Sequence, residues 1–180
     1  MGKQLVYSLE ELVERASERQ KRGGKPPLFL LLEDIQDPGN LGTMLRTGEG
    51  AGVDGVIMSK GTVDIYNPKT IRSTMGALYR VPFLYMDSLE EAMDLLREHE
   101  IAVYAAHLQG RQYFDELAYE EGSAFLIGNE GNGLRRETAG QADVWLKIPM
   151  EGKLESLNAA VAAALLMYQA AGCYRRKERK

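Results

Sequence analysis

The sequence predicts an α/β fold, a mainly parallel sheet flanked by helices, and three observations support this prediction. Short apolar runs typical of strands alternate with segments of helical periodicity along the chain. The run Leu28 to Leu32 is apolar throughout, as expected for a strand covered on both faces. The segments beginning at Ser8 and Ser88 both read Ser-Leu-Glu-Glu, a capping box that opens a helix. With 180 residues, 44% of them hydrophobic, the chain can form one well-packed domain.

The first helix is expected to follow Ser8 and to end in a basic stretch where Gly23 and Gly24 stop it. We expect the core to begin at Leu28, in the first strand. The elements expected after that strand are a helix over 40–51, a strand over 55–58, a helix over 68–78 opened by proline, a strand over 83–85, a helix over 88–98, strands over 101–106 and 124–128, a short helix over 134–139, a strand over 144–148 and an Ala-rich helix over 156–171.

The domain organisation is read from the same pattern. Residues 1–27 are interpreted as a linker with one helix, because Lys3 to Tyr7 is an apolar fragment with no partner strand nearby. Such a linker is expected to follow a separate domain that precedes this chain. Residues 28–174 are predicted to form the folded domain, and residues 175–180 a basic tail.

Composition narrows the class of protein. The net charge of −4 gives no global field that favours nucleic acid, so any RNA contact must come from a local cluster or from another domain. The single cysteine, Cys173, excludes an intramolecular disulfide and indicates a reducing compartment. Two histidines, His99 and His107, are too few for a typical metal site, and no metal is expected. No apolar run reaches membrane-spanning length, so a cytoplasmic protein is the expectation.

Three polar segments, 33–40, 128–133 and 149–158, each follow a predicted strand. The carboxyl ends of parallel strands meet at one edge of a sheet, where ligands usually bind, so we expect one composite site. The glycine-rich segment is not a phosphate-binding P-loop, because Gly133 is followed by Leu134 and Arg135 rather than by Lys and Ser or Thr. The glycine spacing after the first strand also differs from the dinucleotide-binding fingerprint.

These segments form three ordered motifs. The first is 34–42, Asp-Ile-Gln-Asp-Pro-Gly-Asn-Leu-Gly, followed by Arg46 and Gly52. The second is 126–134, Leu-Ile-Gly-Asn-Glu-Gly-Asn-Gly-Leu, and the third is 148–150, Ile-Pro-Met, with 155–162, Glu-Ser-Leu-Asn-Ala-Ala-Val-Ala. In these motifs the chain resembles the SpoU family of RNA ribose 2′-O-methyltransferases in the SPOUT superfamily. The resemblance extends over residues 28–172.

The resemblance implies properties that periodicity does not show. It implies a C-terminal trefoil knot, an exception to the rule that chains avoid threading, and a homodimer with its site at the subunit interface. It also implies S-adenosylmethionine as cofactor, bound mostly through backbone groups. The implied cofactor-binding residues are Gly128, Ile148, Leu157, Ala106, His107, Asn129 and Met150. The implied catalytic positions are Arg46, Asn40, Glu130, Ser156 and Asn158.

A ribose 2′-hydroxyl is a weak nucleophile, so methyl transfer requires precise positioning and removal of its proton. We expect the Arg46 guanidinium to hold the neighbouring RNA phosphate, because a guanidinium does not lose its proton in proteins and is a poor base. Each candidate also has an ordinary structural interpretation. Asn40 and Ser156 suit helix N-caps, and Arg46 suits a solvated helix surface. Glu130 suits an acceptor of backbone N–H groups in its own loop, or a partner of Arg46.

Several functions remain open at this level. Family members modify ribosomal or transfer RNA, and the implied missing RNA-binding domain favours ribosomal RNA. The alternatives are a minimal transfer-RNA ribose methyltransferase, a base methyltransferase, and a non-catalytic RNA-binding module that keeps the fold. The sequence does not identify the RNA, the nucleotide or its base.

Overall fold

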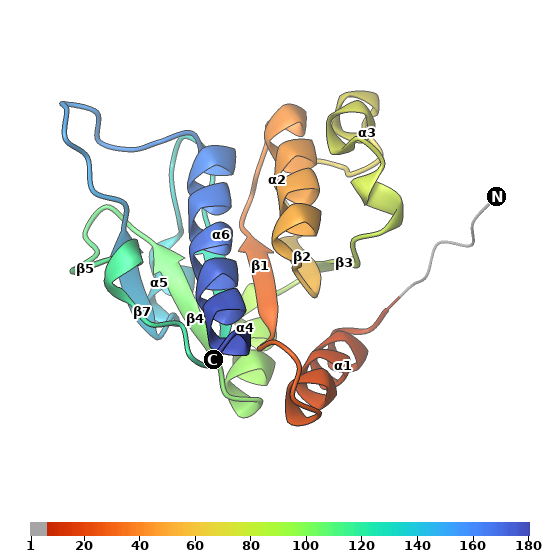
Figure 1. Ribbon diagram of the computed structural model, residues 1–180. Helices are drawn as coiled ribbons and strands as arrows, with labels where there is room; N and C mark the ends of the chain where they lie inside the picture. Colours follow the sequence, from red (N-terminus) through yellow and green to blue (C-terminus); the bar gives the residue numbers. More distant parts are fainter. Residues whose placement is uncertain (1–6) are drawn as a thin grey trace.

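The computed structural model describes residues 7–180 and contains one seven-stranded sheet in the order β3-β2-β1-β6-β4-β7-β5. Every neighbouring pair of strands is parallel, which confirms the predicted sheet (Figure 1). The strands are β1 (Leu28–Leu32), β2 (Gly55–Ser59), β3 (Phe83–Met86), β4 (Ile101–Ala106), β5 (Gln112–Tyr113), β6 (Gly122–Ile127) and β7 (Val144–Lys147).

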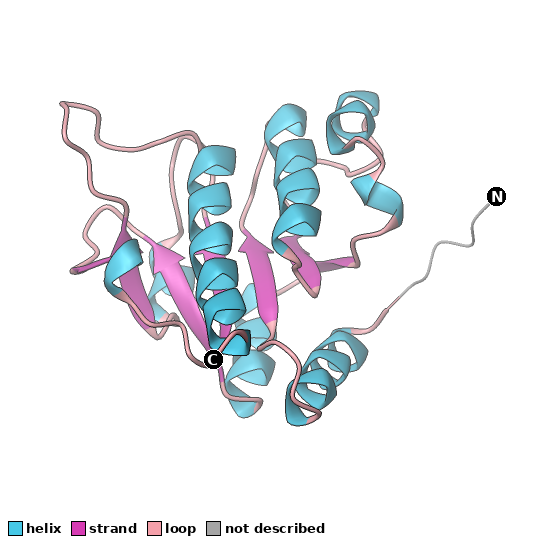
Figure 2. Cartoon of the chain, in the orientation of Figure 1, coloured by secondary structure: helices cyan, strands magenta, loops and turns pink. Residues whose placement is uncertain are grey.

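Helices cover both faces of the sheet (Figure 2). One face carries α2 (Pro38–Ala51), α3 (Pro68–Thr74), the 3₁₀ turn η1 (Ala77–Tyr79) and α6 (Ala159–Glu178). The other carries α1 (Leu9–Lys21), α4 (Leu89–Glu98) and α5 (Arg136–Gly140), and a second 3₁₀ turn, η2 (Phe114–Glu116), lies between β5 and β6. This is a three-layer α/β fold.

The central position of β1 in the sheet accounts for its continuous apolar sequence. All five of its side chains are buried, and they alternate between the two helical layers. Leu28, Leu30 and Leu32 pack with α2 and α6, whereas Phe29 and Leu31 pack with α1 and α4. A strand covered on both faces has no polar side, so its continuous apolar run is the expected pattern.

The helix caps differ from the sequence prediction. Helix α2 begins at Pro38, and its N-cap is Asp37, whose carboxylate accepts the N–H of Asn40 at 2.9 Å. Helix α6 begins at Ala159, and its N-cap is Asn158, whose side chain accepts the N–H groups of Ala160 and Val161. The interpretation of Asn40 and Ser156 as N-caps is therefore wrong. In the first case proline fits the first helical position, so the cap moves to the residue before it.

The helix predicted over 68–78 is interrupted. Met75 has φ of +51° and Gly76 has φ of +88°, and this left-handed pair ends α3 and leads into η1. Strand β5 and η2 were not predicted, because elements of two or three residues carry no periodicity. Helix α6 continues to Glu178 instead of ending near residue 171, so residues 175–178 of the predicted basic tail are helical.

Helix α1 belongs to the core, so the expectation that the core begins at Leu28 is wrong. Its apolar side chains, among them Leu12 and Val13, are buried against the face that carries α4. Arg19 forms an ion pair with Asp54, and the Lys25 ammonium donates to the Gly52 carbonyl at 2.6 Å. The fragment predicted at residues 3–7 lies outside the described residues except for its last position. The preceding RNA-binding domain stays a prediction.

The strands from the C-terminal half of the chain are not adjacent in the sheet in sequence order, so their connections cross over other strands. Strand β6 pairs with β4, and β7 lies on the far side of β4, so the connection from β6 to β7 crosses β4. The trefoil knot implied for this region stays a prediction. Within residues 7–180 no helix combines the length and apolar character needed to cross a membrane.

Candidate functional site

A cavity of about 710 Å³ lies beyond the carboxyl ends of β4, β6 and β7. Its walls come from the loop after each of these strands and from the first turn of α6. The expectation that the polar segments meet at one edge of the sheet is confirmed for the second and third segments, which line this cavity together. All of the residues predicted to bind the cofactor line this cavity, namely Ala106, His107, Gly128, Asn129, Ile148, Met150 and Leu157.

The loop after β6 closes tightly on itself. The Asn129 side-chain oxygen accepts the N–H groups of Gly131 and Asn132 at 2.9 Å each, and the Gly133 N–H donates to the Asn129 carbonyl. A Cβ atom on Gly128 would lie 2.7 Å from the Gly133 carbonyl oxygen and would overlap the backbone nitrogen of Leu134. Gly128 is thus required for closure of the loop itself, whatever binds beside it.

The loop after β4 forms the opposite wall. The His107 ring stacks on the Trp145 indole with centroids 4.1 Å apart, and its Nδ1 accepts the Gln109 N–H at 3.1 Å. The His107 backbone N–H donates to the Leu146 carbonyl, which joins this loop to β7. The imidazole is therefore a fixed part of the wall, and we assign it no catalytic role. Trp145 is the single tryptophan of the chain, so its fluorescence reports on this wall.

The three motifs are joined by one chain of hydrogen bonds. The Glu130 carboxylate accepts the backbone N–H groups of Gln36 at 2.9 Å and Asp37 at 2.7 Å, and the Asn40 amide nitrogen at 3.2 Å. The Asn40 amide oxygen in turn accepts the Asn158 amide nitrogen at 3.0 Å. Glu130, Asn40 and Asn158 come from different motifs and meet beside the cavity, as one composite site requires.

Glu130 carries a negative charge in this arrangement. Burial of its carboxyl group opposes ionisation, but the hydrogen bonds from the backbone of Gln36 and Asp37 prevail and lower the pKa of Glu130 below its ordinary value. The sequence interpretation has Glu130 accept backbone N–H groups of its own loop, whereas its main backbone donors, Gln36 and Asp37, belong to the first motif. The alternative contact with Arg46 is not formed.

Arg46 and Ser156 are both exposed. Arg46 lies on α2 one turn after Gly42, and no hydrogen bond or ion pair involves its guanidinium anywhere in residues 7–180. The group therefore has its full set of donors available for an anion. Ser156 lines the cavity from the loop between β7 and α6, as does Glu130 from the loop after β6. Asn40, Arg46 and Asn158 lie outside the cavity wall.

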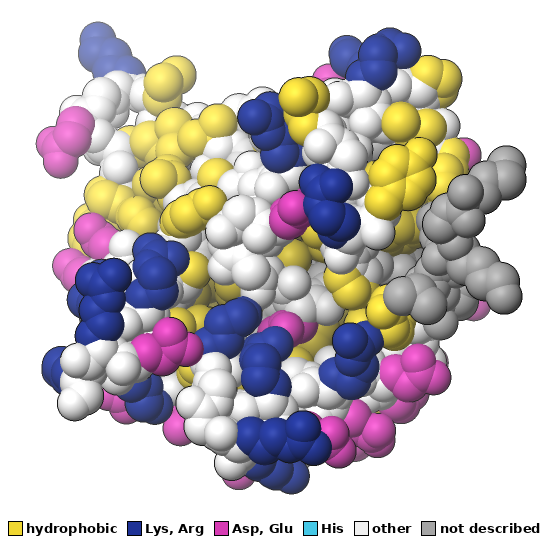
Figure 3. Space-filling model, turned by 45° about the vertical axis from the view of Figure 1, so that its right-hand side comes forward, with side chains coloured by type: hydrophobic (Ala, Val, Ile, Leu, Met, Phe, Trp, Pro, Cys, Tyr) yellow, Lys and Arg dark blue, Asp and Glu magenta, His cyan; other side chains and the backbone are white. Residues whose placement is uncertain are grey.

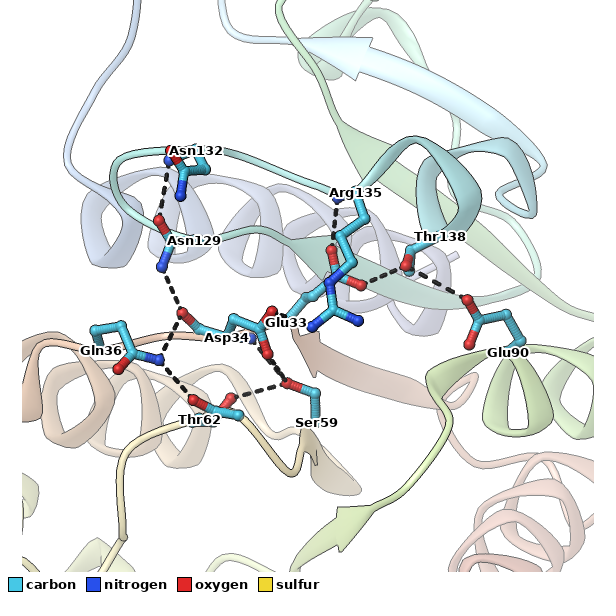
Figure 4. A network of polar contacts seen from close by, with 11 residues as sticks. Glu33, Asp34, Gln36, Ser59, Thr62, Glu90, Asn129, Asn132, Arg135 and Thr138 are labelled. Carbon is cyan, nitrogen blue, oxygen red and sulfur yellow. Dashed lines mark hydrogen bonds and ion pairs between the residues drawn. The ribbon is translucent and has the colours of Figure 1, made fainter.

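Sequence reasoning missed a second polar network, on the other side of the loop after β6 (Figure 4). The Glu33 side chain is 3% exposed, and its carboxylate accepts the Arg135 N–H at 2.7 Å and the Thr138 hydroxyl. Thr138 also lies 3.5 Å from Glu90 on α4. Two acidic residues directly after an all-apolar strand were the available signal, because a buried carboxylate must be hydrogen-bonded.

Asp34 completes this network. It has φ of +53°, an uncommon conformation for a residue other than glycine. Its carboxylate accepts the Ser59 hydroxyl at 2.9 Å and pairs with the Arg135 guanidinium, and its carbonyl accepts the Asn129 amide nitrogen at 2.7 Å. Figure 4 shows Asn129 and Arg135 reaching Asp34 from the two ends of one loop. The network thus fixes the loop that forms one cavity wall.

Comparison with known proteins places these features in a family. Residues 27–168 match the model of the SpoU rRNA Methylase family. The chain belongs to this family. The match includes all three motifs of this SpoU protein and all seven strands of its sheet.

Individual relatives agree with this placement. The 23S rRNA (guanosine(2553)-2′-O)-methyltransferase RlmP of Bacillus subtilis is 41% identical over 143 residues, which are 79% of this SpoU chain and 57% of that protein. The SpoU methyltransferase AviRb from Streptomyces viridochromogenes, solved in complex with the cofactor AdoMet, has 29% identity and a TM-score of 0.78, over 87% of this chain and 62% of that one. A structure concerned with 2-OH methylation on tRNA has 28% identity and a TM-score of 0.76, over 87% of this chain and 100% of that one. This SpoU chain thus spans less than two thirds of the length of the first two relatives.

Proposed function

We propose that this SpoU chain transfers a methyl group from S-adenosylmethionine to a ribose 2′-hydroxyl of structured RNA, and that ribosomal RNA is its substrate. One observation carries the proposal: a cavity suited to the cofactor lies directly beside the hydrogen-bonded chain of Glu130, Asn40 and Asn158. The identity of 41% to RlmP, a 23S rRNA methyltransferase, favours ribosomal over transfer RNA.

The cavity suits S-adenosylmethionine in size and chemistry. Its volume of about 710 Å³ lies within the range of small-molecule pockets, about 300–1,000 Å³. Ile148 and Leu157 would provide apolar surface for the adenine, and loop backbone at Gly128 and Met150 would provide donors and acceptors for the polar groups. The bound cofactor supplies a methyl group on a positively charged sulfur, which a ribose oxygen can attack.

The remaining residues position the RNA. The free Arg46 guanidinium holds the phosphate next to the target ribose with two parallel hydrogen bonds. Asn40 offers donor and acceptor atoms to the ribose, and Glu130 and Asn158 fix the direction of its amide. The hydroxyl proton passes to that phosphate or to water. Such positioning can lower the activation free energy of methyl transfer by as much as about 7–11 kcal/mol.

The proposal includes a homodimer with the site at the subunit interface. Val161, Leu165 and Tyr168 are spaced along one face of α6, and they are 49%, 38% and 45% exposed. Large apolar side chains that recur on one exposed helix face support a protein contact, and here we infer a second copy. A cytoplasmic location is also part of the proposal, and the single cysteine, Cys173, supports it.

Transfer of a labelled methyl group tests the activity. The chain is incubated with methyl-labelled S-adenosylmethionine and, in parallel, with ribosomal and transfer RNA, and each RNA is then hydrolysed by alkali. Alkaline cleavage requires a free 2′-hydroxyl, so ribose methylation leaves the label in dinucleotides. Label in mononucleotides would instead indicate base methylation, and label only in transfer RNA would indicate the minimal transfer-RNA enzyme.

Two further outcomes bear on the mechanism. Arg46→Lys is expected to lose at least tenfold of the methylation rate while keeping cofactor affinity, because lysine lacks the planar pair of donors. Nearly full activity of Arg46→Lys would contradict the phosphate clamp. Binding of RNA and cofactor by the unaltered chain, without label transfer to either RNA, would favour a non-catalytic module.

A further inference from the structure

The surface over α3 and η1 combines exposed cations with exposed rings. Its members are Tyr66, Lys69, Arg72, Met75 and Tyr79, which we call the α3 surface. Tyr66, Met75 and Tyr79 are 48%, 67% and 80% exposed, and Lys69 and Arg72 are exposed as well. Large aromatic and apolar side chains are usually buried in a fold of this size, so their exposure in one place calls for a partner.

The α3 surface is continuous with the catalytic residues. The Lys69 side chain crosses onto α2, where its Cε lies 3.7 Å from the position of a Cβ on Gly39, the residue before Asn40. Gly42 on α2 lies so close to α3 that a Cβ there would be 2.7 Å from the Thr70 carbonyl oxygen. Because the two helices pack this closely, an RNA strand bound at Asn40 and Arg46 could continue over α3.

The charges of this region differ from those of the whole chain. The net charge of the chain is −4, yet Lys69 and Arg72 have no ion-pair partner in the described part of the structure. Arg80 is paired with Glu49. Two other carboxylates nearby accept backbone N–H groups: Asp64 accepts that of Tyr66, and Asp37, which lies beside the Lys69 side chain at Gly39, accepts that of Asn40. Figure 3 turns this side forward and shows Lys and Arg side chains among hydrophobic ones over its upper right part, where acidic side chains are sparse.

We propose that the α3 surface binds the RNA segment next to the methylated nucleotide. Lys69 and Arg72 contact its phosphates, and the Tyr79 ring stacks on an unpaired base. Single-stranded RNA is bound in this way, by cations along the backbone and by aromatic faces against the bases. An acidic protein partner would use the cations but would leave the exposed tyrosine faces unexplained. The inference rests on the proposed function, because it extends the RNA path from the same site.

Fluorescence anisotropy of a labelled RNA stem–loop with an unpaired loop tests the proposal. Lys69→Glu/Arg72→Glu is compared with Lys21→Glu/Arg22→Glu, which makes the same charge change on exposed residues at the end of α1. Loss of two phosphate contacts is expected to weaken binding at least about tenfold and to reduce the salt slope, d log K/d log[salt], by about 1.4–1.8. Tyr79→Ala is expected to weaken binding roughly fivefold or more, and Tyr79→Phe to change it little.

The affinity for S-adenosylmethionine is measured on every variant through the change in Trp145 fluorescence, and it is expected to be unchanged. Equal RNA affinities for the α3 pair and the α1 pair would overturn the proposal, as would absence of RNA binding by the unaltered chain. If the α3 pair weakened binding of poly-glutamate but left RNA affinity unchanged, the partner of this surface would be an acidic protein. This result would also overturn the proposal. If the unaltered chain did not bind S-adenosylmethionine, the proposed function would be refuted instead. Failure of the RNA-surface proposal and failure of the proposed function are therefore distinguishable.

Discussion

Replacing Glu33 by Leu removes the centre of the polar network behind the cavity. The Glu33 carboxylate is 3% exposed and is the acceptor for the Arg135 N–H and the Thr138 hydroxyl. Leucine fills much of the same volume but accepts no hydrogen bond, so both donors lose their partner. A buried donor left without an acceptor costs about 1–3 kcal/mol, and of the two residues Thr138 is the buried one.

The surroundings of the two donors narrow the expected loss of stability. The Thr138 hydroxyl can turn toward Glu90, 3.5 Å away, and so recover part of its loss, whereas the Arg135 N–H has no other acceptor among residues 7–180. We therefore expect Glu33→Leu to lower the free energy of unfolding by about 3 kcal/mol, or the melting temperature by about 6–12 °C for a chain of this length. Glu33→Gln keeps one acceptor and is expected to cost about 1 kcal/mol.

Urea unfolding measures these differences. Glu98→Leu is the control, because Glu98 is exposed on α4 and makes no hydrogen bond in the described residues, so a change within about 0.5 kcal/mol is expected. Adding Thr138→Val to Glu33→Leu removes one orphaned donor and should cost less than the two single losses combined. The reasoning is refuted if Glu33→Leu behaves like Glu98→Leu, or if the two losses are additive.

Two further predictions concern the loop after β6. Gly128→Ala is expected to lower stability by about 1–3 kcal/mol in urea unfolding, because its Cβ would overlap fixed backbone at Gly133, whereas a Cβ on Gly131 meets only Asn129 Oδ1 at 3.6 Å and should be tolerated. Equal effects of the two substitutions would contradict this. Glu130 has a lowered pKa, so its stabilisation is complete above the ordinary carboxyl pKa and is lost as pH falls through the lowered value. The urea midpoint of Glu130→Gln should therefore fall less on acidification than that of the unaltered chain, and parallel pH profiles would refute the argument.

The local elements followed from the sequence because each is set by neighbouring residues. The apolar run of β1 and the capping boxes that begin at Ser8 and Ser88 both act over a few residues. The position of the polar segments after predicted strands also indicated that they meet at one edge, since parallel strands bring their following loops there. That Gly128, Ile148 and Leu157 in particular line the cavity was implied by the family resemblance and not by this rule.

Tertiary structure alone decided the partners of the polar groups. Glu33 and Thr138 are 105 residues apart, and Asn40 and Asn158 are 118 apart, so no local pattern pairs them. The same holds for α1, whose apolar face was visible but whose place in the core depended on its contacts with a distant helix, α4, and with the sheet. Periodicity shows which side of an element is apolar. Which donor meets which acceptor depends on strand order and helix packing, because a hydrogen bond requires atoms to approach within about 3 Å.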